Sequence, residues 1–243
     1  FLAINAWATQ VSAAAWSFLT LLGETPVLFA FLSPLLLWRP KLFVAVLAAV
    51  PLGGVLSVAL KAWANAPRPA TLIDNTLFTI IGPLLNNASF PSGHTLTAFA
   101  AAVALVAAGR RQGTAVDSRH DAGWARVSGA ALVLLLAGLV GLSRIAVGAH
   151  WPLDVLAGAA CGALAGQSGA WLAGRYPAVW QSAVSRFAIG QAMLLTALWL
   201  LLRPTDYPLG RAAIALAVVC ALVTVGGQFA VWWRLLRRKQ IAK

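Results

Sequence analysis

A succession of apolar runs, most of them long enough to cross a bilayer as a helix, constrains this chain more than any other feature. A helix of roughly 20 apolar residues spans the hydrocarbon core of a membrane, where only helices and closed barrels satisfy their backbone. Of the 243 residues, 60% are apolar and 10% are charged. We therefore predict an all-α, polytopic membrane bundle of about six to eight transmembrane helices. The runs lie at residues 26–38, 42–63, 94–109, 127–147, 153–173, 187–202 and 211–233.

The chain divides into three parts by composition. Residues 1–23 are apolar but interrupted by polar side chains such as Asn5 and Gln10, so an interfacial helix and a weak first span both remain open. Residues 24–173 form the expected core, and residues 174–243 add two C-terminal helices and a basic tail. A polar segment between residues 110 and 126 is predicted to be a solvated loop.

The distribution of Lys and Arg predicts the orientation in the membrane. Most of the 18 basic residues fall on one set of alternate loops, which we assign to the cytoplasm. The net charge of +12 then follows from topology and from attraction to anionic lipid, so no nucleic-acid partner is predicted. The other side, facing the periplasm or the exterior, holds only Lys61, Arg68, Arg144, Arg203 and Arg211.

The outward-facing segment SRIAVGAHWPLD, residues 143–154, carries three ionisable groups between two apolar runs. Charge near hydrocarbon is costly and usually functional. His150 and Asp154 are spaced to share a helix face, and Pro152 suits a first helical turn. Asp154 can therefore accept a hydrogen bond from one ring nitrogen of His150 and leave the other free to attack. From this segment alone, an interfacial Arg and a His that caps a helix explain the pattern equally well.

Two further segments are predicted on the same side of the membrane. KAWANAPRP supplies Lys61 and Arg68, and PSGH supplies Ser92, Gly93 and His94 at the start of an apolar run. Alone, the two basic residues fit snorkelling anchors, Ser92 a helix cap, and His94 a polar residue in a first turn. Together with Arg144 they predict a site for a multiply charged anion, because guanidinium forks and a helix N-terminus both bind phosphate.

Small residues recur every fourth position after Asp154, as Gly158, Gly162 and Gly166, with Ala170 and Gly174 continuing the stripe. Such spacing lets helices approach closely, so we predict a packing face beneath the site. The alternative is a chain that is simply rich in Gly and Ala.

These motifs resemble those of the membrane-bound type 2 phosphatidic acid phosphatase superfamily. The three-part signature of that family, Lys-x6-Arg-Pro, Pro-Ser-Gly-His and Ser-Arg-x5-His-x3-Asp, matches Lys61–Pro69, Pro91–His94 and Ser143–Asp154 at every position. The resemblance implies that His150 is a nucleophile that forms a phosphohistidine, that Asp154 orients it, and that His94 is the general acid. The implied phosphate-binding set is Lys61, Arg68, Ser92, Gly93 and Arg144.

The resemblance also implies a hydrolase of lipid phosphates in a bacterial inner membrane, with its active site facing the periplasm and undecaprenyl diphosphate as the first candidate substrate. Alternative substrates are lipid A 1-phosphate, phosphatidylglycerophosphate and phosphatidic acid, and a lipid can replace water as the phosphoryl acceptor. More distant alternatives are a vanadate-dependent haloperoxidase and a non-catalytic lipid-binding protein. The motifs hold no carboxylate cluster suited to magnesium, so we expect no metal and no cofactor. The expected partners are the lipid phosphate and membrane lipids, and the oligomeric state is not predicted.

Overall fold

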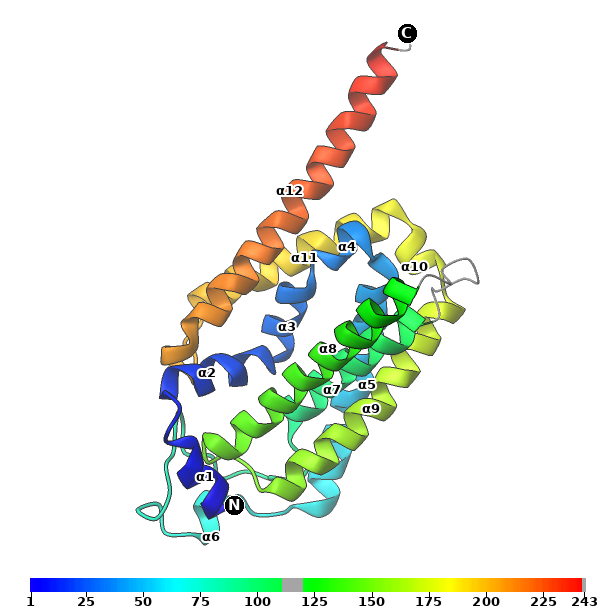
Figure 1. The fold of residues 1–243 in the computed structure, drawn as a ribbon. Helices are drawn as coiled ribbons and strands as arrows, with labels where there is room; N and C mark the ends of the chain where they lie inside the picture. Colours follow the sequence, from blue (N-terminus) through cyan, green and yellow to red (C-terminus); the bar gives the residue numbers. More distant parts are fainter. Residues whose placement is uncertain (111–119, 242–243) are drawn as a thin grey trace.

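The computed structural model describes residues 1–110 and 120–241, and within these residues all regular structure is helical (Figure 1). Side chains of residues 120–126, 235, 236 and 238–241 are not described. The helices are α1 (Leu2–Ala8), α2 (Ala13–Leu22), α3 (Thr25–Leu32), α4 (Leu35–Trp38), α5 (Pro40–Ala64), α6 (Pro69–Leu72), α7 (Gly93–Arg110), α8 (His120–Ala146), α9 (Pro152–Arg175), α10 (Ala178–Gln181), α11 (Ala183–Leu202), the 3-10 turn η1 (Pro208–Gly210) and α12 (Arg211–Ile241).

Helix length and composition support the predicted membrane bundle. Five helical segments in the described part of the chain are long and apolar enough to span a bilayer: α5 with α6, α8, α9, α11, and η1 with α12. Helices α2 and α3 form a sixth span if the pair, bent by 78°, is counted as one. The all-α polytopic bundle is therefore confirmed, and its five or six spans lie at or just below the lower limit of the six to eight predicted.

The centre of the bundle is α7, which packs lengthwise against α5, α8 and α9 (Figure 1). Its contact with α9 depends on three glycines. A Cβ at Gly158, Gly162 or Gly166 would lie 2.5–2.7 Å from a backbone oxygen of α7 or of the residue before it. The predicted packing face is thus confirmed for these three positions, whereas a Cβ at Gly174 would meet no atom of the described residues within 4 Å.

Two helices extend further than their apolar runs predict. Helix α8 begins at His120, so the prediction of a loop is wrong for residues 120–126. Helix α12 continues to Ile241, well past residue 233. A helix satisfies its own backbone in water as well as in lipid, so charged residues can continue it beyond the membrane. The remainder of the predicted loop, residues 111–119, lies outside the described part of the chain.

The bend between α2 and α3 brings the N-terminal region against the core. A Cβ at Gly23 would lie 2.7 Å from Cγ1 of Val140 and 3.0 Å from Cβ of His94, so the bend needs a residue without a side chain. Helix α12 packs against α2, α3 and α11 (Figure 1). Helices α11 and α12 form the C-terminal hairpin, and the turn between them adjoins the same end of the bundle as His94.

Candidate active site

The three motifs meet at one end of the bundle, where α5 ends, α7 begins and α8 passes into α9. Backbone N–H of Ser92 donates to the carbonyl of Asp154 at 3.0 Å, which joins the starts of α7 and α9. Arg68 Nη1 donates to the carbonyl of Ala149 at 2.7 Å, which joins the segment after α5 to the α8–α9 turn. Gly148 makes that turn possible, because its φ of +78° is costly for other residues. The structure thus brings together segments that are far apart in the sequence.

His150 and Asp154 form the predicted pair. Nδ1 of His150 lies 3.2 Å from Oδ2 of Asp154. The same oxygen accepts hydrogen bonds from Ser89 Oγ and from the backbone N–H of Trp151. Pro152 occupies the first turn of α9, as predicted. With its Nδ1–H donated to the carboxylate, His150 carries its lone pair on Nε2, which faces Arg68 Nη1 at 3.2 Å.

The environment of His150 favours its neutral form. The residue is 2% exposed. Burial lowers its pKa from 6.5 to about 3, and the charges of Arg144 and Arg68 act in the same direction, whereas the hydrogen bond to Asp154 opposes them. A neutral imidazole near pH 7 is the form that can attack phosphorus.

Two of the predicted basic residues hold the loop that carries Ser89. Arg68 Nε donates to the backbone oxygen and the side-chain oxygen of Asn87, at 3.0 and 2.8 Å. Lys61 Nζ donates to the carbonyls of Ala88 and Ser89, at 2.8 and 3.3 Å. Arg68 is 6% exposed, so the alternative of a surface anchor does not describe it. Both side chains line the site and hold the loop of residues 87–89 in place by hydrogen bonds.

Arg144 and His94 each have a buried nitrogen without a hydrogen-bond partner in the described part of the chain. These atoms are Nε of Arg144 and Nε2 of His94. The Arg144 guanidinium is positioned by Tyr207, whose hydroxyl accepts from Nη1 at 2.9 Å and whose ring lies 5.6 Å from Cζ. Buried polar atoms normally have a hydrogen-bond partner. Because these two nitrogens lie in a site that also holds the positive charges of Lys61 and Arg68, we infer that their partner is an anion.

Ser92 and Gly93 form the start of α7. The carbonyl of Ser92 accepts from the backbone N–H of Leu96 at 3.0 Å, and its hydroxyl accepts from Thr95 at 2.9 Å. Ser92 therefore occupies the helix-capping position. Among the residues that the structure describes, a Cβ at Gly93 would meet only Ser57 Oγ, at 3.7 Å, so there is room over the N-terminus of α7. That room suits the close approach of phosphate oxygens to backbone N–H groups.

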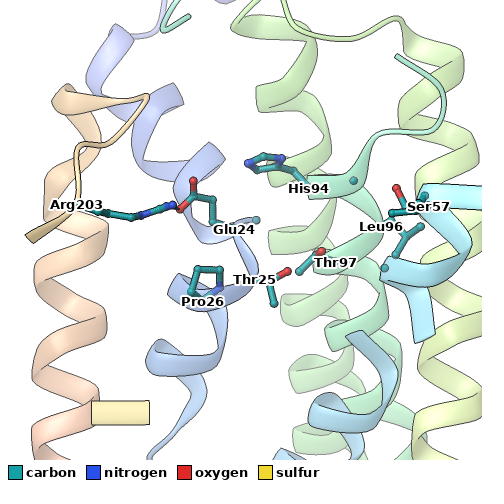
Figure 2. A pocket seen from close by; sticks show the side chains of 12 residues that line it. Glu24, Thr25, Pro26, Ser57, His94, Leu96, Thr97 and Arg203 are labelled. Atoms are coloured by element: carbon teal, nitrogen blue, oxygen red, sulfur yellow. Dashed lines mark hydrogen bonds and ion pairs between the residues drawn. The ribbon is translucent and has the colours of Figure 1, made fainter. Parts of the chain in front are cut away.

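A cavity of about 360 Å³ adjoins His94 on the side of the α2–α3 bend (Figure 2). The His94 ring points toward Glu24, which pairs with Arg203 from the end of α11 (Figure 2). The cavity is lined by Gly23, Glu24, Thr25, Pro26, Gly54, Ser57, Val58, Gly93, His94, Leu96, Thr97 and Arg203.

Several residues of the site were not predicted from the sequence. Ser89, Asn87 and Tyr207 make their contacts across long separations in the chain, and no local pattern marks them. Glu24 and Arg203 are marked in the sequence only by their position, since a lone charge beside an apolar run is itself unusual. The described residues hold no group of three or more His, Cys, Asp or Glu side chains placed to bind a metal ion, and metal independence stays a prediction.

Comparison with known proteins matches the region of the chain that holds the three motifs. The sequence model of the PAP2 superfamily matches residues 41–176, which is more than half of the chain. The chain belongs to the PAP2 superfamily. The matched region contains all three motifs, and the predicted resemblance is confirmed. Glu24, Arg203 and Tyr207 lie outside it.

Two individual proteins are similar to this chain. A lipid A 1-phosphatase of Porphyromonas gingivalis is 40% identical over 84 residues, which cover 35% of this chain and 16% of that protein. The crystal structure of Aquifex aeolicus LpxE superimposes with a TM-score of 0.53 and 29% identity, and the match covers 69% of this chain and 93% of that one. The chain thus matches a small part of the first relative and almost all of the second.

Proposed function

We propose that this protein is a lipid phosphatase that hydrolyses a phosphate ester at the outer face of a bacterial inner membrane. The observation that carries the proposal is a buried histidine, held by Asp154, in a site where Arg144 and His94 each have a buried nitrogen without a hydrogen-bond partner in the described part of the chain. Phosphoryl transfer needs a positioned nucleophile and stabilisation of charge on the equatorial oxygens. The arrangement supplies both, and PAP2 membership supports the reaction class.

The reaction proceeds in two steps. Nε2 of His150 attacks phosphorus, a P–N bond forms, and the P–O bond to the lipid breaks as its oxygen takes a proton from His94. Water then attacks the phosphohistidine and gives a proton to His94, the P–N bond breaks, and inorganic phosphate leaves. Asp154 holds the first imidazole throughout, while Lys61, Arg68, Arg144 and the start of α7 bind the phosphate oxygens.

The substrate that the comparisons favour is a glycolipid 1-phosphate of the lipid A type, because the P. gingivalis relative is a lipid A 1-phosphatase. Undecaprenyl diphosphate, the first candidate from sequence, remains a comparison substrate. Both place a phosphate at a lipid head, where it can reach a site at the membrane surface.

Phosphate release from a panel of lipids in detergent micelles tests the proposal. The panel contains a lipid A-type 1-phosphate, undecaprenyl diphosphate, phosphatidylglycerophosphate and phosphatidic acid, with His150→Ala as the matched control. We expect turnover in EDTA, inhibition by vanadate, an acid-labile phosphoenzyme in rapid quench, and at least about a thousandfold loss in the variant. Release at wild-type rates from His150→Ala would exclude the nucleophile, and activity lost in EDTA and restored by magnesium would exclude the metal-free mechanism.

A further inference from the structure

The cavity beside His94 lies on the side of the site where the leaving group of the proposed reaction is expected. The nucleophile and the leaving oxygen lie on opposite sides of phosphorus in an in-line displacement. If His94 protonates that oxygen, the rest of the leaving group lies on the His94 side. The cavity adjoins His94 there, and its volume of about 360 Å³ falls within the range of about 300–1,000 Å³ that is usual for small-molecule sites.

The wall of this cavity opposite His94 is charged. Glu24, at the α2–α3 bend, and Arg203, at the end of α11, form a partly buried ion pair with side-chain exposures of 16% and 26%. Nε of Arg203 is buried and has no hydrogen-bond partner in the described part of the chain. Hydroxyl-bearing residues Thr25, Thr97 and Ser57 add polar groups to a lining that is otherwise mostly apolar. An ion pair at the edge of a membrane bundle is costly unless it is used, so this wall points to an occupant with a polar group.

One side of the cavity is apolar and open. Val58 of α5 is 69% exposed, and a Cβ at Gly54, one turn earlier, would meet no described residue within 4 Å. Helix α3 touches α5 only lightly, so the two helices diverge around the cavity. An occupant with a polar head and an apolar tail fits this shape, with the tail directed past Val58 into lipid.

We propose that the cavity is the leaving-group subsite and that Glu24 and Arg203 recognise hydroxyl or amide groups on a carbohydrate leaving group. The carboxylate accepts from sugar hydroxyl groups and the guanidinium donates to hydroxyl or carbonyl oxygens. This inference rests on the proposed phosphatase function. It assigns specificity to two residues outside the matched family region, one from each end of the chain.

Kinetics of Glu24→Gln test the proposal, because the substitution keeps the shape and removes the charge. We expect KM for a lipid A-type 1-phosphate to rise about tenfold or more, as for the loss of a hydrogen bond to a charged group. Vanadate inhibition reports on the phosphate site alone and should change less than about twofold. The matched control is Arg211→Gln, an exposed charge on the same side of the bundle that does not line the cavity, and it should change neither quantity.

The double variant Glu24→Gln/Arg203→Gln distinguishes substrate recognition by the ion pair from a purely structural role of that pair. It removes both charges and leaves no unpaired ion, so a purely structural pair would regain wild-type kinetics, whereas a recognition pair would not. Restored KM in the double variant, equal effects on KM and on vanadate inhibition, or a wild type that cleaves other lipid phosphates but not the glycolipid would each overturn this inference. A wild type that releases phosphate from no lipid of the panel would instead overturn the proposed function.

Discussion

At the scale of single residues, one carboxylate oxygen organises the site. Oδ2 of Asp154 accepts from the ring of His150, from Ser89 and from the backbone of Trp151. Three donors on one oxygen fix its position, and this in turn fixes the tautomer of His150. Burial then keeps that imidazole neutral. The nucleophile is therefore prepared by its surroundings before substrate binds.

The lowered pKa of His150 predicts its response to acid. A histidine with a pKa of 6.5 would lose about thirtyfold of its neutral form at pH 5. Because the pKa of His150 is lowered to about 3, it stays neutral and nucleophilic there. With p-nitrophenyl phosphate, whose leaving group needs no proton, the rate of phosphoenzyme formation in rapid quench should stay level from about pH 7.5 to 5. A fall centred near pH 6.5 would show that His150 titrates normally.

Tyr207 is predicted to be a positioning residue for Arg144. Removing its hydroxyl in Tyr207→Phe deletes the nearer of two acceptors of Arg144 Nη1, leaves Thr20 Oγ1 at 3.4 Å, and keeps the ring beneath the guanidinium. We expect both KM and the vanadate inhibition constant to rise about two- to tenfold, the range of one net hydrogen bond. Tyr176→Phe is the matched control, since the only other tyrosine is 56% exposed and distant in the sequence from every motif. Equal KM values and equal vanadate inhibition constants for the two variants would show that Tyr207 does not position Arg144.

At the scale of helices, glycines set how closely α9 approaches α7, and that approach places Asp154 beside Ser92. The spacing of the stripe was visible in the sequence because helical periodicity is a local property. The position where the close contacts stop was not, because it depends on which residues of the neighbouring helices lie opposite each glycine. A Cβ at Gly166 would lie 2.7 Å from the carbonyl oxygen of Ala100, whereas a Cβ at Gly174 would have no neighbour among residues 1–110 and 127–234 within 4 Å.

Alanine substitution at these two glycines should affect the stability of the protein differently. Gly166→Ala overpacks the α7–α9 contact and should lower stability by about 1–3 kcal/mol. Gly174→Ala adds only helix propensity and should be neutral, or stabilising by up to about 1 kcal/mol. Thermal unfolding in one detergent, followed by intrinsic fluorescence, measures both. Similar unfolding temperatures for the two variants would show that α7 and α9 do not depend on this contact.

At the scale of the whole molecule, the sequence predicted the class of fold and the end of the bundle that holds the motifs. Ionisable residues at the edges of apolar runs carry that information. The sequence did not predict the bend at Gly23 and Glu24, the support of Arg144 by Tyr207 or the cavity beside His94. Each of these depends on packing between the termini and the core, which no local pattern encodes. The C-terminal hairpin thus contributes to the site, although it lies outside the family match.

The side of the membrane that the site faces is the remaining prediction for the whole molecule. Lys61, Arg68 and Arg144 contact or neighbour the site, so setting them aside leaves only Arg203 and Arg211 among the basic residues of that side. The charge bias therefore becomes stronger, and it places the site outside the cytoplasm. Trp63, which is 81% exposed, and Trp151 suit the aromatic belt at that membrane surface.

Cysteine labelling tests this orientation in intact spheroplasts. In a background without Cys161 and Cys220, Asn75→Cys places a thiol on the exposed loop between α6 and α7, at the same end as the site. Ala178→Cys places one on the exposed start of α10, beyond the opposite end of α9. An impermeant thiol reagent should label Asn75→Cys at once and Ala178→Cys only after lysis, because the bilayer separates the two ends. The reverse pattern would put His150 in the cytoplasm, and a lipid presented from the outer leaflet could not then be the substrate.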